Sequence, residues 1–173
     1  MKKRNITWGL VIVVIAFLIS PGAAQAQMET KSGDMVLTAG AGLSALSFGF
    51  NGNFQFNVTN KIAAHPSVNY NNYGGGTLLS VDAWAGYHGL KNIPFLNASA
   101  EGKENIDAYL MFGPTYYSGQ DESGFAFGAG GGARYYLNDK IGITVEGKYR
   151  MIVGDGYSYV KWYEVGVGLS YSL

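Results

Sequence analysis

Apolar residues alternate with small or polar ones, with a period of two, along almost all of the chain beyond its N-terminal region. In residues 48–58, for example, Phe48, Phe50, Phe54 and Phe56 alternate with asparagine, glutamine and glycine. Successive side chains of a β-strand point to opposite faces of a sheet, so this pattern predicts strands with one apolar and one polar face. Because no helical periodicity of comparable length appears, the chain is predicted to be all-β.

Eight runs of this kind follow one another, and each has ten residues or more. A tilted strand needs roughly 9–11 residues to cross a bilayer, so each run is long enough to span one. Pro66 lies inside the third run and cannot donate a ladder hydrogen bond, which is expected to weaken the pairing there. The predicted strands are residues 35–44, 48–58, 62–71, 77–88, 105–117, 124–137, 141–151 and 161–173.

The connections between the runs alternate between two kinds. "VTNKIAAHPSVNY" (58–70) and "LNDKIGITVEGKY" (137–149) align with each other, Lys61 matching Lys140, and both predict a tight hairpin. Tight turns at one rim and looser loops at the other are typical of an up-and-down barrel threaded through a membrane. The stretch 89–104 is long for the tight-turn rim, and the sequence does not predict what it forms. The predicted looser loops, rich in Gly, Ser, Asn and Asp, include 71–76, 118–124 and 153–159.

The apolar faces of the strands are predicted to point outward. An eight-stranded barrel has an interior just wide enough to be filled by side chains, so it has no room for Phe, Tyr and Leu from every strand. In water, an outward apolar belt of this size would exceed what a soluble monomer exposes, whereas a bilayer matches it. Residues 35–173 are therefore predicted to form an eight-stranded antiparallel up-and-down transmembrane β-barrel.

The inward face is predicted to carry small residues, amides and a network of paired charges in the lumen. Pairing avoids an isolated charge in a dry interior. We favour a structural salt-bridge network in a largely filled lumen over a selectivity ring or a proton path. The predicted network consists of Asp82, Asp107, Arg134, Glu146, Lys148, Arg150 and Glu164.

The turn at 138–140 predicts the register of the strands that flank it. If Leu137 lies opposite Ile141, then Glu146, Lys148 and Arg150 face three glycines, at 132, 130 and 128, and long charged side chains are expected to lie over them. Placing residue 152 opposite residue 160 across the last loop sets Lys148 beside Glu164. The last strand is predicted to close the barrel by pairing with the first, near 36–44, which leaves no open edge in the membrane.

Residues 1–26 are predicted to be a cleaved signal peptide, followed by a short periplasmic segment, 27–34. Lys2, Lys3 and Arg4 precede an apolar stretch and an Ala-Gln-Ala cleavage signal ending at Ala26. The apolar stretch is shorter than the roughly 20 residues of a spanning helix. Cleavage leaves nine basic and 12 acidic residues, a balance that gives no sign of nucleic-acid binding.

Three segments resemble the small bacterial outer-membrane β-barrel family, similar to opacity-type proteins and to the membrane domain of OmpA. They are "AYLMFGPTYY" (108–117), "FGAGGGARYYLNDKIGITVEGKYR" (127–150) and "VGVGLSYSL" (165–173). The resemblance implies a protein exported to the outer membrane of a bacterial cell and surrounded by outer-membrane lipids, and it implies no particular activity.

The resemblance also implies how the barrel is assembled. Periplasmic chaperones and the outer-membrane assembly machinery would handle the chain, and the alternating closing strand would be the signal that the machinery reads. Leu173 stands where the family usually has a terminal Phe. The implied assembly signal consists of Val165, Val167, Leu169, Tyr171 and Leu173.

Few residues suggest chemistry. His65 and Ser67 share a strand face, and barrel lipid hydrolases use His and Ser, but a base also needs a third group to orient it. The pair is predicted to face the lumen with no carboxylate identified beside it, so the chain is not expected to be an enzyme. His65 and His88 are the only histidines and there is no Cys, which makes a poor metal site, and no cofactor is expected.

The function predicted first is an integral outer-membrane barrel with a structural or surface-interaction role, adhesin-like or opacity-like, whose surface ligand is not specified. A narrow porin-like channel for small solutes is the main alternative. A secreted lipocalin-like binder of small hydrophobic molecules would need its apolar face inside. A lipid A-modifying hydrolase is the remaining alternative.

Overall fold

The computed structural model describes residues 31–44, 47–73, 76–90, 105–120, 122–152 and 161–173, and the predicted signal peptide lies outside them. The strands form one closed antiparallel barrel in which each pairs with its neighbours in the chain and β8 pairs with β1. This confirms the predicted eight-stranded up-and-down barrel. The strands are β1 (Met35–Ser44), β2 (Ser47–Asn57), β3 (Ile62–Tyr73), β4 (Gly76–His88), β5 (Ile106–Gly119), β6 (Ser123–Tyr136), β7 (Ile141–Ile152) and β8 (Lys161–Ser172).

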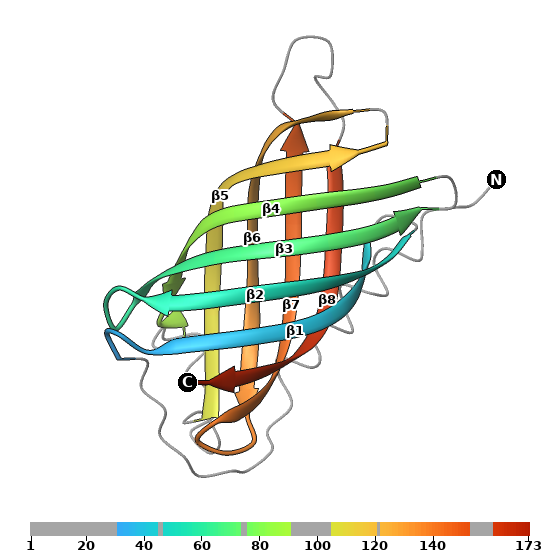
Figure 1. Ribbon diagram of the computed structural model, residues 1–173. Helices are drawn as coiled ribbons and strands as arrows, with labels where there is room; N and C mark the ends of the chain where they lie inside the picture. The colour runs from blue at the N-terminus through green and yellow to red at the C-terminus, as the bar shows by residue number, and fades with distance from the viewer. Residues whose placement is uncertain (1–30, 45–46, 74–75, 91–104, 121, 153–160) are drawn as a thin grey trace, which may run out of the picture.

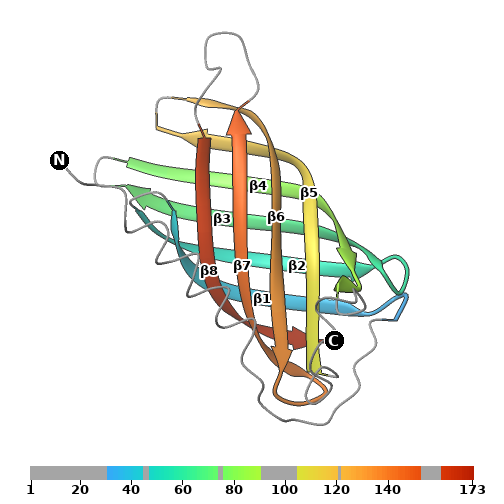
Figure 2. The same cartoon turned by 180° about the vertical axis from the view of Figure 1, so that it is seen from behind.

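The strands are strongly inclined, so that β1–β4 cross β5–β8 when the barrel is seen from the side (Figures 1 and 2). The end of β8 lies beside the start of β1 (Figure 1), and their register runs from Val36 opposite Ser172 to Ser44 opposite Glu164. The predicted closure near 36–44 is therefore confirmed. Closure removes the row of unpaired backbone groups that an open sheet would expose.

The registers predicted around the last two hairpins are confirmed as well. Leu137 donates its backbone N–H to the carbonyl of Ile141 at 2.8 Å. Glu146, Lys148 and Arg150 lie opposite the glycines at 132, 130 and 128, and Lys148 also lies opposite the carboxylate residue at 164 on its other side.

The two matching turns are held by short polar side chains. The Asn138 side-chain oxygen accepts the backbone N–H groups of Lys140 and Ile141, both at 2.9 Å. The Thr59 hydroxyl accepts those of Lys61 and Ile62 at 3.2 and 3.0 Å. Such side chains stabilise a turn by replacing a backbone partner, which explains why both sequences form tight hairpins at the same rim.

The loops at the opposite rim are shorter than predicted. Only residues 45–46 separate β1 from β2, 74–75 separate β3 from β4, and 120–122 separate β5 from β6. The strands continue through residues that the sequence marks as loop, because antiparallel pairing satisfies their backbone groups to the end of the ladder. The connection from β7 to β8, 153–160, is the longer one at this rim.

Pro66 interrupts the ladder as predicted. The pairing of β2 with β3 stops at Asn53 opposite Ser67 and resumes at Phe56 opposite Ala64, on either side of the proline. Pro114 has the same effect between β4 and β5, where the register omits its position. Each proline lacks an N–H for one neighbouring strand and keeps its pairing with the other.

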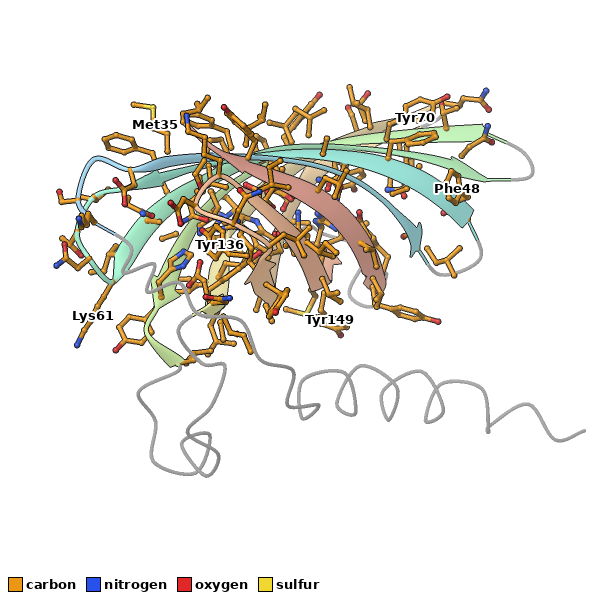
Figure 3. All side chains as sticks on the ribbon, turned by 90° about the horizontal axis from the view of Figure 1, so that it is seen from below. Met35, Phe48, Lys61, Tyr70, Tyr136 and Tyr149 are labelled. Atoms are coloured by element: carbon orange, nitrogen blue, oxygen red, sulfur yellow. The ribbon has the colours of Figure 1, made fainter. Side chains whose placement is uncertain are left out.

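The two faces of the barrel are inverted relative to a soluble protein. Phe112 and Phe125 are both 65% exposed, whereas Arg134 and Arg150 have no exposed surface. Figure 3 shows outward-facing side chains such as Tyr149 around the wall and polar atoms gathered inside it. An outward apolar surface of this extent is stable against lipid and not against water. Within the described ranges there is no helix long and apolar enough to span a bilayer.

Candidate functional site

Asp82, on β4, is the centre of the polar interior. Its side chain is 1% exposed, so its charge has almost no water to solvate it. Both carboxylate oxygens are instead contacted by donors from three other strands, β3, β5 and β7. These donors are Arg150 at 2.7 and 3.1 Å, Ser67 at 2.6 Å, Thr115 at 2.7 Å, Asn69 at 3.0 Å and Lys148 at 3.5 Å.

Arg150, on β7, joins this carboxylate to a second one. Its Nη1 donates to Glu164 Oε2 at 2.9 Å, while Nε and Nη2 donate to Asp82. The guanidinium carbon lies 5.3 Å from the centre of the Trp84 ring and 5.7 Å from that of Trp162. A planar guanidinium can form a fork with carboxylates and stack on aromatic faces at once, which Lys cannot do.

Lys148 and Glu146 form the middle of the network. Lys148 Nζ lies 3.5 Å from Glu146 Oε2 and 3.5 Å from Asp82 Oδ2. The other oxygen of Glu146 accepts the Tyr109 hydroxyl at 2.6 Å and the Asn53 amide at 3.1 Å. Side chains from four strands, β2, β4, β5 and β7, therefore meet in one hydrogen-bonded cluster.

Asp107 forms the part of the network nearest the tight-turn rim. It accepts His88 Nδ1 at 2.9 and 3.0 Å and Arg134 Nη1 at 3.3 Å. Arg134 Nη1 also donates to Gln55 and to the Tyr136 hydroxyl. All seven predicted lumen charges are thus buried, and each lies within ion-pair distance of an opposite charge.

Aromatic rings, and not charged side chains, lie over the glycines of β6, contrary to the sequence prediction. A Cβ on Gly128 would collide with the Trp84 ring, and one on Gly132 would lie 2.8 Å from the Tyr109 hydroxyl oxygen. Both rings are almost fully buried. The Lys148 ammonium and the Arg150 guanidinium lie 5.7 and 5.3 Å from the centre of the Trp84 ring, and that ring occupies the space directly above Gly128.

We expect the substitution Gly128→Val to destabilise the barrel, because the added side chain must displace Trp84 from a packed interior. Overpacking of this kind costs about 1–3 kcal/mol. The free energy of unfolding in urea, measured on barrels folded in lipid vesicles, reports the effect. Gly147→Val is the matched control, since a Cβ there meets no atom within 4 Å. Equal losses in the two variants would contradict the proposed packing.

His65 and Ser67, a pair that is not expected from the sequence to be catalytic, have different hydrogen-bond partners. Ser67 donates to Asp82 at 2.6 Å, so a carboxylate that could not be identified from the sequence lies beside it. His65 Nε2 lies 2.9 Å from His88 Nε2, and no hydrogen bond joins His65 to Ser67. A nucleophile needs its base within hydrogen-bond reach, and this pair does not meet that requirement.

A chain of two imidazoles and one carboxylate, His65, His88 and Asp107, is a feature that sequence reasoning missed. The residues lie on β3, β4 and β5, and their proximity depends on the register of three strands. Alternation along single strands predicts which face a residue occupies but not its neighbour across the barrel. Among the described residues, no group of three or more His, Cys, Asp or Glu is arranged to hold a metal ion.

The predicted assembly signal lies on β8 with its side chains outward. Val167, Leu169, Tyr171 and Leu173 are between 44% and 70% exposed. Val165, the first residue of the signal, lies on the same face and is partly buried. Beyond the end of the strand, Leu173 still donates its backbone N–H to the carbonyl of Met35 at 3.0 Å. Recognition of this strand during assembly remains a prediction.

Comparison with protein-family models and with curated proteins found no match. Solved structures do match. The N-terminal β-barrel domain of Pseudomonas aeruginosa OprF has a TM-score of 0.61 at 13% identity, covering 82% of this chain and 98% of that chain. A de novo designed transmembrane β-barrel has a TM-score of 0.59 at 18% identity, covering 84% and 100%.

A third solved structure is Ail, the attachment invasion locus protein of Yersinia pestis, with a TM-score of 0.56 at 14% identity, covering 82% of this chain and 99% of that chain. Identities this low show a common fold and carry no residue-level correspondence. The fold is the part of the predicted resemblance that these structures confirm. The chain therefore has the fold of the small eight-stranded outer-membrane β-barrels.

Proposed function

We propose that the protein is an integral β-barrel of a bacterial outer membrane, with a structural or surface-interaction role and a lumen closed by its own side chains. The observation that carries this proposal is the inverted pattern of burial, with the apolar residues outside and a paired charge network inside. Outer-membrane lipids are then the main partner of its surface, and the assembly machinery and chaperones are partners during export.

The closed lumen is supported by the way that the network crosses the barrel. Arg150 lies between two indole rings and joins the carboxylates of β4 and β8, so that moving it would break several contacts at once. A selectivity ring, by contrast, leaves its charges free to contact a passing ion. The similarity to a designed barrel agrees with a fold that needs no transport activity to be stable.

A surface-interaction role would use the rim opposite the tight turns. Three of the four connections there have two or three residues, so 153–160 is the segment that a surface ligand would contact first. The name of the Yersinia protein refers to attachment and invasion, and the present chain shares its fold. We propose no catalytic activity, because His65 and Ser67 are hydrogen-bonded to other partners and not to each other.

Conductance in planar lipid bilayers tests the closed lumen. We expect no current steps from the wild-type barrel, because the network blocks the lumen. The double substitution Arg150→Ala and Glu164→Ala removes one cation and one anion, so steps are expected to appear without a change in net charge. Lys140→Ala, on an exposed turn, is the control and is expected to give no current steps. Wild-type steps that vanish on heat denaturation would instead support the porin-like alternative.

Cell fractionation tests the location separately. The protein is expected in the outer-membrane fraction and in solution only with detergent. Recovery of soluble protein from the periplasm or the medium without detergent would contradict the membrane proposal and favour a secreted binder.

A further inference from the structure

We propose that His65, His88 and Met111 form a binding site for one soft monovalent metal ion of the copper(I) class, near the tight-turn end of the lumen. The two Nε2 atoms are 2.9 Å apart, whereas the ring centres are 5.1 Å apart and the ring planes differ by 6°. The nitrogens are therefore the closest parts of the rings and face one another. Both side chains are 1% exposed.

A glycine makes room for this arrangement. A Cβ on Gly86 would lie 2.5 Å from His65 Nε2 and 3.5 Å from His88 Nε2, so the imidazoles meet directly above that position. Met111 is the cross-strand partner of Gly86 on β5 and is 2% exposed. Inward side chains of directly opposed residues start about 4.5–5.5 Å apart. The Met111 side chain therefore starts from the position directly opposite the glycine over which the two nitrogens meet.

The hydrogen bonds determine which nitrogens carry protons. A carboxylate only accepts, so His88 donates its Nδ1–H to Asp107, and in the neutral form of that ring Nε2 carries a lone pair. His65 donates its Nε2–H to that lone pair. His65 Nδ1 is left as a buried acceptor, and no hydrogen-bond partner reaches it. When an ion binds between the two Nε2 atoms, the His65 proton moves from Nε2 to Nδ1, so neither imidazole has to lose a proton.

The donor set and the charge both favour a soft monovalent ion. Imidazole and thioether groups suit copper(I), whereas zinc usually takes four ligands that include thiolate or carboxylate. With both imidazoles neutral, the described lumen has four carboxylates and three permanent cations, so one bound monovalent cation balances its charge. The carboxylates are Asp82, Asp107, Glu146 and Glu164, and the cations are Arg134, Lys148 and Arg150.

The surroundings of the site are compatible with a bound cation. Asp107 accepts a hydrogen bond from His88 Nδ1, on the opposite side of the ring from the proposed ion. A carboxylate in this position commonly orients a histidine that binds a metal. Arg134 and Lys148 are the nearby positive charges, and each is already paired, Arg134 with Asp107 and Lys148 with Asp82 and Glu146. The two nitrogens are 2.9 Å apart. For each to bond to the ion at about 2 Å, they must move further apart by about 1 Å at most.

Silver(I), a redox-stable soft monovalent ion, is the probe for this site. We expect calorimetry of the detergent-folded barrel in chloride-free buffer to show one silver ion bound per barrel. Imidazole nitrogen NMR should show both Nε2 resonances shifting and a proton appearing at His65 Nδ1. Wild-type barrel that binds no silver, or whose Nε2 resonances stay in place, overturns the proposal.

Variants assign the ligands. His65→Gln and Met111→Leu are each expected to weaken silver binding at least about tenfold, and Asp107→Asn about 10–100-fold through its effect on His88. Met151→Leu is the matched control, because Met151 points outward and is 43% exposed. Met111→Leu is nearly isosteric, so it remains informative if the polar variants fail to fold. Binding in Met111→Leu that is as tight as in wild type rejects the three-ligand site.

Discussion

The substitution Asp82→Ala is expected to lower the free energy of unfolding by about 3–5 kcal/mol, which is the usual cost of leaving a buried charge without its partner. Arg150 would keep Glu164 but lose both bonds to Asp82, and Lys148 would lose one of its two carboxylates. Urea unfolding of barrels folded in lipid vesicles measures the loss. Heat-modifiable migration on gels shows independently whether the variant folds.

Two further variants make this result specific to the buried charges. Asp139→Ala removes a carboxylate from an exposed turn and is expected to change stability by less than about 0.5 kcal/mol. Arg150→Met alone removes a shared partner of Asp82 and Glu164, so the loss in the double variant Asp82→Ala/Arg150→Met is expected to differ from the sum of the two single losses, because groups in one network are not additive. A loss below about 1 kcal/mol for Asp82→Ala alone would contradict the role of this carboxylate as the centre of the network.

Alternation and turn chemistry were sufficient to predict most of the fold. A strand has only two faces, and a membrane barrel must have its apolar face outside, so the inward position of Asp82 follows from its parity in the predicted strand. The register of β6 with β7 followed from the Asn138 turn, since the glycines opposite Glu146, Lys148 and Arg150 are those predicted.

The contacts across the lumen could not be predicted in this way. Trp84 belongs to the polar face by parity, but its position over Gly128 depends on how β4 and β6 approach one another through the interior. His65, His88 and Asp107 come from three strands, and only the complete set of registers brings them together. The shorter loops escaped prediction for another reason, since glycines at strand ends look like loop residues until pairing is known.

The second large effect is the loss of stability when arginine is placed on the lipid-facing surface of the barrel. Two residues of nearly equal exposure, at different depths in the bilayer, allow a comparison. Val167 lies in the middle of β8 and is 55% exposed, and Leu137 lies at the tight turn after β6 and is 53% exposed. Arginine on the lipid face of a barrel costs about 2–4 kcal/mol at the bilayer midplane and about 0–1 kcal/mol near the interface. We therefore expect Val167→Arg to destabilise the vesicle-folded barrel far more than Leu137→Arg.

The comparison separates the bilayer from other causes. Both substitutions replace a half-exposed apolar side chain with the same charged one, so loss of packing should affect the two sites to a similar extent. Only a medium whose polarity changes with depth distinguishes them. Urea unfolding of both variants in vesicles measures the difference, and similar losses would contradict a membrane-spanning barrel. Repeating the measurement in vesicles of thinner bilayers should reduce the cost at Val167, because a thinner hydrocarbon layer brings the midplane arginine closer to water.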